Sequence, residues 1–200
     1  GWRESDGAPL GGIEFCDQCG FDARAVDNEP AELDHVFAEL ADLLDHPYRA
    51  RRPEPETYSA DEYVDHCVEV ARALLGMIID GTGIEQHTHI DDLPSARAAA
   101  AQVLPSLSGE RRDVRHTGTY SHDVSAGWIA RHLLHDLAHH VLDIRCGYAK
   151  LALDELPGNW TAGRGKGTVA QVNDLEVRRA HVGDSKALVP LFDVLGYPTE

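Results

Sequence analysis

Histidines are the residues of this sequence best suited to chemistry, and there are 12 of them among 200 residues. Imidazole is the commonest side-chain ligand for metal ions and titrates near neutral pH. One predicted helix holds four of these histidines, at His132, His135, His139 and His140. Residues four apart lie on one face of a helix, so His135 and His139 are placed to hold one metal ion between them.

A third ligand has to come from another helix. His66 is the best-placed candidate, because it lies in the middle of a predicted helix among apolar residues that face the presumed core. Three histidines from two helices, with one coordination position left for water, have the form of a catalytic zinc site. The sequence thus predicts a divalent-metal site formed by His66, His135 and His139. We favour Zn²⁺, and Ni²⁺, Fe²⁺ or Mn²⁺ would also suit imidazole ligands.

Side chains near these ligands are candidates for catalysis or for positioning. Asp136, Arg131 and His132 adjoin the paired histidines and could contact substrate, and Asp136 and Asp143 could orient the ligands. Tyr63 lies about one turn before the ligand on the other helix, where it lines either the metal pocket or the apolar core. The alternatives for the histidines are a solvated helix face, a contact between copies of the chain, or a metal-free cluster that responds to pH.

Four amphipathic segments must position these residues. Apolar residues recur at steps of three and four along each of them, which predicts helices at residues 30–45, 59–79, 93–107 and 124–150. Ser59 followed by Glu62 has the pattern of a capping box at the start of the second helix. We therefore predict an all-α fold, a four-helix bundle over residues 30–150.

The segment before the bundle, residues 1–29, is predicted to be irregular and contains a CxxC pair, Cys16 and Cys19. Such a pair is half of a zinc-ribbon pattern, but no second CxxC or CxxH follows, and Cys67 and Cys146 lie in predicted helices. We interpret the pair as a compact turn in a reduced protein. A metal shared with distant partners is the less favoured alternative.

After the bundle, residues 151–168 are predicted to form a Gly-rich linker and residues 169–200 a short β-α tail. One strand and one helix cannot bury their own apolar faces. The tail is therefore expected to pack on the bundle, pair with another chain, or stay mobile.

The composition excludes several classes of partner. With 34 acidic against 18 basic residues, the formal net charge is −16, which disfavours binding to nucleic acid or to an anionic membrane. Hydrophobic residues make up 42% of the chain, too many for a disordered acidic tail. The few cysteines and the absence of an apolar leader at the first residues predict a cytoplasmic protein with a small-molecule substrate.

Two segments carry a resemblance to a known family. Residues 58–66 resemble the second helix of the DinB/YfiT-like superfamily, and residues 132–144 resemble its last bundle helix. Residues 16–24 resemble the start of one DinB-like branch, so that the resemblance spans roughly residues 15–146. The superfamily includes mycothiol-dependent maleylpyruvate isomerase and bacillithiol S-transferases.

This resemblance implies a four-helix bundle that holds a divalent metal, with His66, His135 and His139 as the ligands. It also implies an enzyme that activates a low-molecular-weight thiol such as mycothiol, as an S-transferase or isomerase, or that activates water. A metal-bound thiol is deprotonated outright and is nucleophilic at neutral pH. The oligomeric state stays open, and a homodimer paired through helix faces is compatible with such a bundle.

A second resemblance concerns the last residues. Residues 174–199 are similar to the first strand and helix of a GNAT acetyltransferase, but the Gly-rich loop that binds pyrophosphate in that family is absent. An alternative to the enzyme is therefore a non-catalytic, metal-stabilised bundle that serves as a dimerisation or accessory module of a fused acetyltransferase.

Overall fold

The computed structural model describes residues 2–4, 13–16, 18–116, 123–155, 170–172 and 175–177. The chain divides into two units, residues 1–154 and residues 155–200. The first unit contains the four α-helices found among the described residues. In the second unit, the described residues form one short hairpin, in which β5 (Ala170–Val172) pairs antiparallel with β6 (Leu175–Val177).

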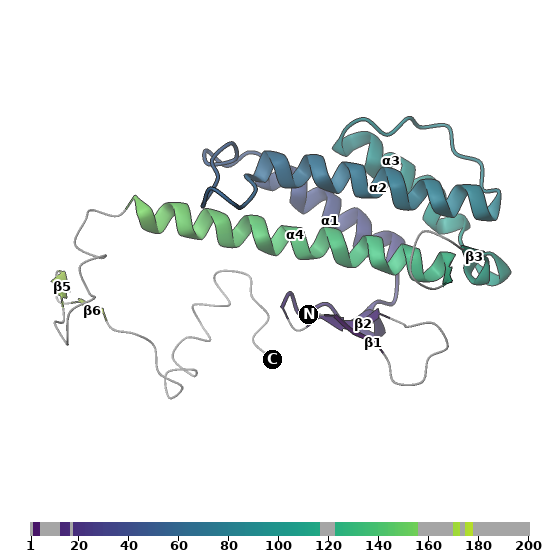
Figure 1. Ribbon diagram of the computed structural model, residues 1–200, viewed down its shortest axis with the longest axis horizontal. Helices are drawn as coiled ribbons and strands as arrows, with labels where there is room; N and C mark the ends of the chain where they lie inside the picture. The colour runs from purple at the N-terminus through teal and green to yellow at the C-terminus, as the bar shows by residue number, and fades with distance from the viewer. Residues whose placement is uncertain are drawn as a thin grey trace. The chain divides into compact units, whose positions relative to one another are not determined.

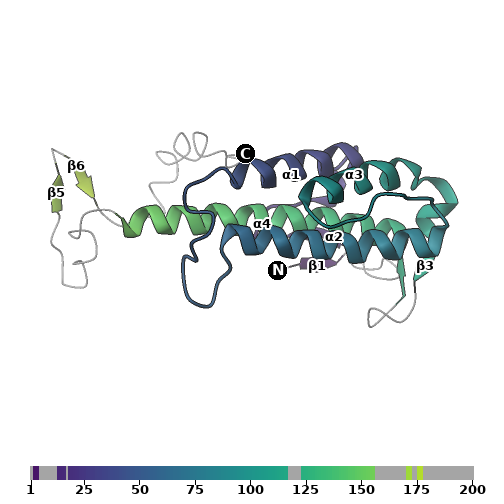
Figure 2. The same cartoon turned by 90° about the horizontal axis from the view of Figure 1, so that it is seen from above.

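Four helices lie side by side in the first unit: α1 (Glu29–Leu43), α2 (Ala60–Thr82), α3 (Leu93–Val103) and α4 (Ala126–Asp154) (Figure 1, Figure 2). Helices α1 and α2 each pack against both α3 and α4. Leucine, isoleucine, valine and phenylalanine side chains fill the space between them. The largest fully buried ones on the four helices are Leu33, Phe37, Leu40, Leu75, Ile78, Val103, Ile129, Leu133 and Leu137.

Short strands and 3-10 helices surround this core. β1 (Trp2–Glu4) pairs antiparallel with β2 (Ile13–Cys16), and β3 (Arg115–His116) pairs antiparallel with β4 (Val124–Ser125) just before α4. The 3-10 helices cover Ala23–Ala25, Leu104–Ser106 and Gly109–Asp113. No helix among the described residues has both the length and the apolar character needed to cross a lipid bilayer.

The predicted helices are confirmed within a few residues, whereas three other expectations need correction. Residues 1–29 are not simply irregular, because β1 and β2 form a hairpin and Phe15 pairs with Asp22. Helix α4 runs to Asp154 and so takes up the start of the predicted linker. The tail holds two short strands at 170–177 in place of one, and its predicted helix at 185–195 lies outside the described residues. Strands of three or four residues offer too few positions for a clear alternating pattern.

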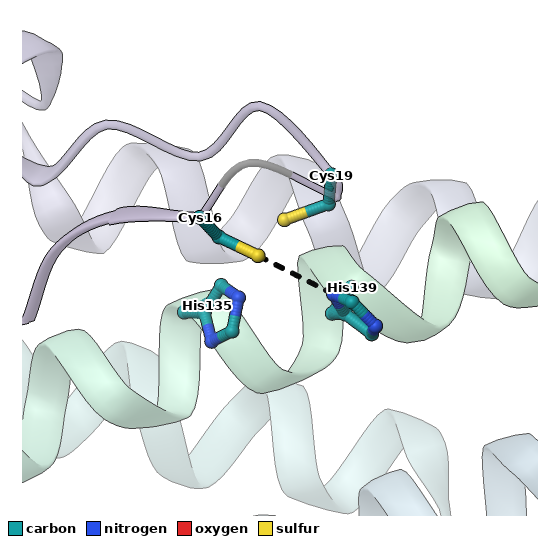
Figure 3. A group of neighbouring side chains, drawn as sticks. All are labelled: Cys16, Cys19, His135 and His139. Carbon is teal, nitrogen blue, oxygen red and sulfur yellow. Dashed lines mark hydrogen bonds between the residues drawn. The ribbon is translucent and has the colours of Figure 1, made fainter. Parts of the chain in front are cut away.

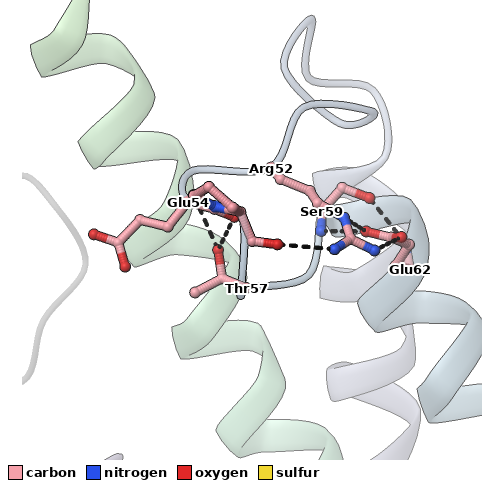
Figure 4. Close-up of polar contacts among 6 residues, drawn as sticks. Arg52, Glu54, Thr57, Ser59 and Glu62 are labelled. Carbon is pink, nitrogen blue, oxygen red and sulfur yellow. Dashed lines mark hydrogen bonds and ion pairs between the residues drawn. The ribbon is translucent and has the colours of Figure 1, made fainter.

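The start of α2 is fixed by the capping box (Figure 4). The Ser59 hydroxyl accepts a hydrogen bond from the Glu62 backbone N–H at 3.3 Å, and the Glu62 carboxylate accepts one from the Ser59 N–H at 2.8 Å. Arg52 donates two hydrogen bonds to the same carboxylate, one from Nε at 2.8 Å and one from a second guanidinium nitrogen. This arrangement sets where the helix begins, and therefore where Tyr63 and His66 lie one and two turns further on.

The Arg52–Glu62 pair makes the stability of the bundle depend on pH. Arg52, together with the Ser59 backbone N–H, lowers the pKa of Glu62 from 4.5 to about 2. A carboxyl group whose pKa is lowered by folding stabilises the folded state above its unfolded pKa, and this contribution is lost as the pH falls through the folded value. We predict that Glu62→Gln lowers the urea midpoint at neutral pH and that the difference from wild type shrinks as the pH falls from about 4.5 toward 2.

The matched control is Glu69→Gln, at an exposed position of the same helix. It should leave the urea midpoint within error at every pH. A Glu62→Gln effect of equal size at acidic and neutral pH would mean that the charge of Glu62 is not what stabilises this helix start.

Candidate metal centre

Helix α4 carries two pairs of potential ligands, and the second pair begins one residue after the first. His135 and His139 are four residues apart, and so are Asp136 and His140. Each pair lies along one face of the helix, but a step of one residue rotates the direction by about 100°. The two pairs therefore face different neighbours. Among the described residues, potential ligands gather at this helix in two groups, each of which contains one pair.

The first group, called here the inter-helix group, consists of His66, Asp136 and His140. His66 comes from α2 and the other two residues from α4, which packs along α2. Their ligand atoms all lie within 4.8 Å of one another, and the rings of His66 and His140 are 5.1 Å apart. All three side chains are half-buried. Two imidazoles and a carboxylate thus converge from two helices.

Asp143 orients His140 within this group. His140 Nδ1 lies 2.9 Å from Asp143 Oδ2. A carboxylate only accepts hydrogen bonds, so Nδ1 carries the proton and the other ring nitrogen, Nε2, can present its lone pair. That Nε2 lies 3.8 Å from Asp136 Oδ2, a separation that leaves room for a cation between the two atoms. A histidine held by a carboxylate through its second nitrogen is the usual arrangement behind a metal ligand.

A pocket of about 230 Å³ adjoins the inter-helix group, and Tyr63 and Asp143 are among its lining residues. The Tyr63 ring lies 5.1 Å from that of His140. Lys150 and Glu54, which form an ion pair, also line the pocket. None of the three potential ligands lines this pocket, and Tyr63 and Asp143 are the residues that connect it to His140.

Tyr63 stays protonated in this setting. Burial raises the pKa of its phenol, and the negative charge of Asp143 and the neighbouring Tyr58 raise it further. The Tyr58 ring lies 5.4 Å from that of Tyr63 and 6.4 Å from that of His66. Tyr63 can thus donate a hydrogen bond to a molecule in the pocket at neutral pH.

The second group, called here the Cys/His group, consists of Cys16, Cys19, His135 and His139 (Figure 3). Cys16 is the last residue of β2, which contacts α4, and Cys19 follows the strand, whereas the histidines come from α4. All four ligand atoms lie within 4.8 Å of one another. Cys16 and His135 are almost completely buried, with exposed fractions of 1% and 2%.

The electrostatics of the Cys/His group ease ionisation of Cys16 and keep the ring of His135 neutral. Burial opposes the thiolate of Cys16, but hydrogen bonds from the backbone N–H groups of Cys19 and Gln18 outweigh it and lower the pKa of Cys16. Burial raises the pKa of Cys19 to about 11. Burial and the neighbouring histidines lower the pKa of His135 to about 3, so its ring is neutral at physiological pH, the form that binds metals.

The structure thus splits the predicted set of ligands. His135 and His139 lie together as predicted, but they face the cysteines, whereas His66 belongs with Asp136 and His140. The reason is the phase of α4, since the face that carries His135 and His139 is not the face that packs against α2. The CxxC segment is a turn, as predicted, and it also meets two histidines that lie far away in the sequence.

The structure places the four predicted catalytic candidates in different surroundings. Asp136 is a potential ligand and Tyr63 lines the adjoining pocket. Arg131 instead pairs with Glu29 at the start of α1, at 3.1 Å, and so ties two helices together. His132 stacks on Trp128 at 4.9 Å, and burial lowers the pKa of its ring. Neither Arg131 nor His132 belongs to a group of potential ligands.

His140 is the potential ligand of the inter-helix group that the sequence prediction left out. The signal that could have identified it is the spacing of four between Asp136 and His140, which repeats the spacing of the pair one residue earlier. For the cysteines no such signal exists, because 123 residues separate Cys16 from His139.

No protein-family model, curated protein or solved structure matches this chain significantly.

Proposed function

We propose that the protein is a divalent-metal-dependent enzyme whose metal is bound by His66, Asp136 and His140. The observation that carries this proposal is the convergence of three donor groups from two helices, with ligand atoms within 4.8 Å of one another. The four helices are compatible with the bundle that the resemblance to the DinB/YfiT-like superfamily implies, but the site proposed here keeps only His66 of the three ligands implied by that resemblance. We infer Zn²⁺ as the metal, because two imidazoles and one carboxylate are a common catalytic zinc ligand set.

Three protein ligands leave at least one coordination position for water or substrate. A divalent ion in such a site supplies Lewis acidity and lowers the pKa of a bound water or thiol to near neutral or below. The chain's own residues hold and orient the reactants. Asp143 fixes the ring of His140, and Tyr63 offers a protonated hydroxyl at the edge of the pocket.

The pocket limits what the enzyme can bind. Its volume of about 230 Å³ is below the roughly 300–1,000 Å³ typical of pockets for drug-sized ligands. A small substrate, or the thiol-bearing end of a larger cosubstrate, fits this space. We therefore propose activation of water or of a low-molecular-weight thiol toward a small electrophile.

The small pocket also favours the second candidate, a non-catalytic bundle in which metal serves only stability. The two candidates differ in whether the inter-helix metal has an open coordination position. An exogenous ligand can reach an open position, whereas a metal with a complete set of protein ligands excludes it.

We predict that Co²⁺-loaded protein changes its visible d–d absorption when 2-mercaptoethanol or azide is added. The double variant His66→Ala, His140→Ala should lose this change, because two of the three ligands are gone. Arg131→Ala is the matched control on α4 and should retain it, since Arg131 pairs with Glu29 and not with the inter-helix group. No spectral change in the wild type, or an unchanged response in the double variant, would contradict the proposal.

Asp143 should tune the affinity of this site without being a ligand. We predict that Asp143→Asn weakens Zn²⁺ binding about 10–100-fold, because the substitution removes the negative charge that orients and polarises His140. Competition titration with a chromophoric chelator measures this loss. Asp154→Asn, at an exposed position of the same helix, should bind Zn²⁺ as the wild type does. Equal affinities for the Asp143 and Asp154 variants would remove Asp143 from the site.

A further inference from the structure

The Cys/His group plays no part in the proposed catalysis, although it contains more donor atoms than the inter-helix group. Two thiols and two imidazoles approach one another there from opposite ends of the first unit's sequence. This donor set, Cys₂His₂, is one of the standard structural zinc sets, which are four-coordinate and leave no open position.

The distances fit a tetrahedral ion. Cys16 Sγ lies 3.8 Å from His139 Nδ1 (Figure 3). With Zn–S bonds of about 2.3 Å and Zn–N bonds of about 2.0 Å, a tetrahedral angle places sulfur and nitrogen about 3.5 Å apart. The limit of 4.8 Å on all pairs of ligand atoms means that small side-chain movements bring the rest of the set to bonding distance.

The backbone around the cysteines is shaped to stabilise thiolates. The Gly20 N–H donates to the Cys16 carbonyl at 2.9 Å, and the Cys16 N–H donates to the Phe21 carbonyl at 2.8 Å, which closes a tight turn. Gly20 has φ of +75°, a conformation that favours glycine. Within this turn the backbone N–H groups of Gln18 and Cys19 donate to the Cys16 sulfur, and that of Phe21 donates to the Cys19 sulfur. Such hydrogen bonds offset the negative charge of metal-bound sulfur.

The ring of His139 lies between Cys16 and the carboxylate of Asp143. Its Nδ1 faces Cys16, whereas its Nε2 lies 4.0 Å from Asp143 Oδ1. The ring therefore directs one nitrogen to the sulfur atoms and the other toward a carboxylate, the arrangement expected of a histidine that binds a metal through Nδ1.

We propose that Cys16, Cys19, His135 and His139 form a second, structural zinc site that fastens the N-terminal segment to α4. The site has all four ligands from this chain, so it does not activate a substrate. Its role is to stabilise the packing of the segment after β2 on the helix that carries both groups. The proposal does not depend on the inter-helix metal, and each site can fail without the other.

The test is alkylation of the cysteines by iodoacetamide, read by mass spectrometry of peptides, in Zn²⁺-loaded protein and in protein treated with a chelator under reducing conditions. Bound zinc should slow the labelling of Cys19, the more exposed cysteine of the pair, by about tenfold or more, because a metal-bound thiolate is not free to react. Cys146, which is exposed, should be labelled in both samples, and the fully buried Cys67 in neither. These two cysteines are internal controls, and no substitution is needed.

Co²⁺ gives a second, independent readout. The wild type should show sulfur-to-cobalt charge transfer in the near-ultraviolet, which Cys16→Ser together with Cys19→Ser should abolish and Cys146→Ser should retain. The variant His66→Ala, His140→Ala should also retain it, which separates this site from the inter-helix site. Equal labelling of Cys19 with and without zinc, or charge transfer that survives loss of both cysteines, would overturn the proposal.

Discussion

The rotation of about 100° per residue along α4 is the constraint on which both proposed sites depend. Two pairs of potential ligands, at 135 with 139 and at 136 with 140, begin at adjacent residues. One helix therefore presents two separate faces that each carry potential metal ligands. One face meets α2 and the other meets the segment after β2. A rotation of α4 about its axis by a single residue would turn one pair toward the other pair's partner and the second pair away from both, so the apolar packing that fixes the rotation of α4 also decides which ligands meet.

Buried apolar residues that lie among and on either side of the ligands in the sequence supply that packing. Leu133, Leu137 and Val141 are buried against the other helices and hold α4 in one rotational position. Asp143 then joins the two faces, because one of its oxygens lies 2.9 Å from His140 and the other lies 4.0 Å from His139. The Asp143 carboxylate thus lies near one potential ligand of each group.

The helices were predictable from the sequence because each contains several turns of apolar residues at steps of three and four, with a cap such as Ser59 at its start. The potential of α4 and of His66 to bind metal was predictable from residue type and spacing. What could not be predicted is which neighbour each face of α4 meets, since that depends on how α1, α2 and the N-terminal hairpin pack against it. His140 was therefore placed outside the site and His135 inside it with His66. The partners of the CxxC pair lie more than a hundred residues further along the chain, beyond the reach of any local pattern.

Crystals of the zinc-loaded protein, measured on both sides of the zinc absorption edge, test the central claim most directly. The account predicts two anomalous peaks beside α4, one bounded by His66, Asp136 and His140 and the other by Cys16, Cys19, His135 and His139. A single peak contacted by His66, His135 and His139 together, or no peak beside α4, would contradict it.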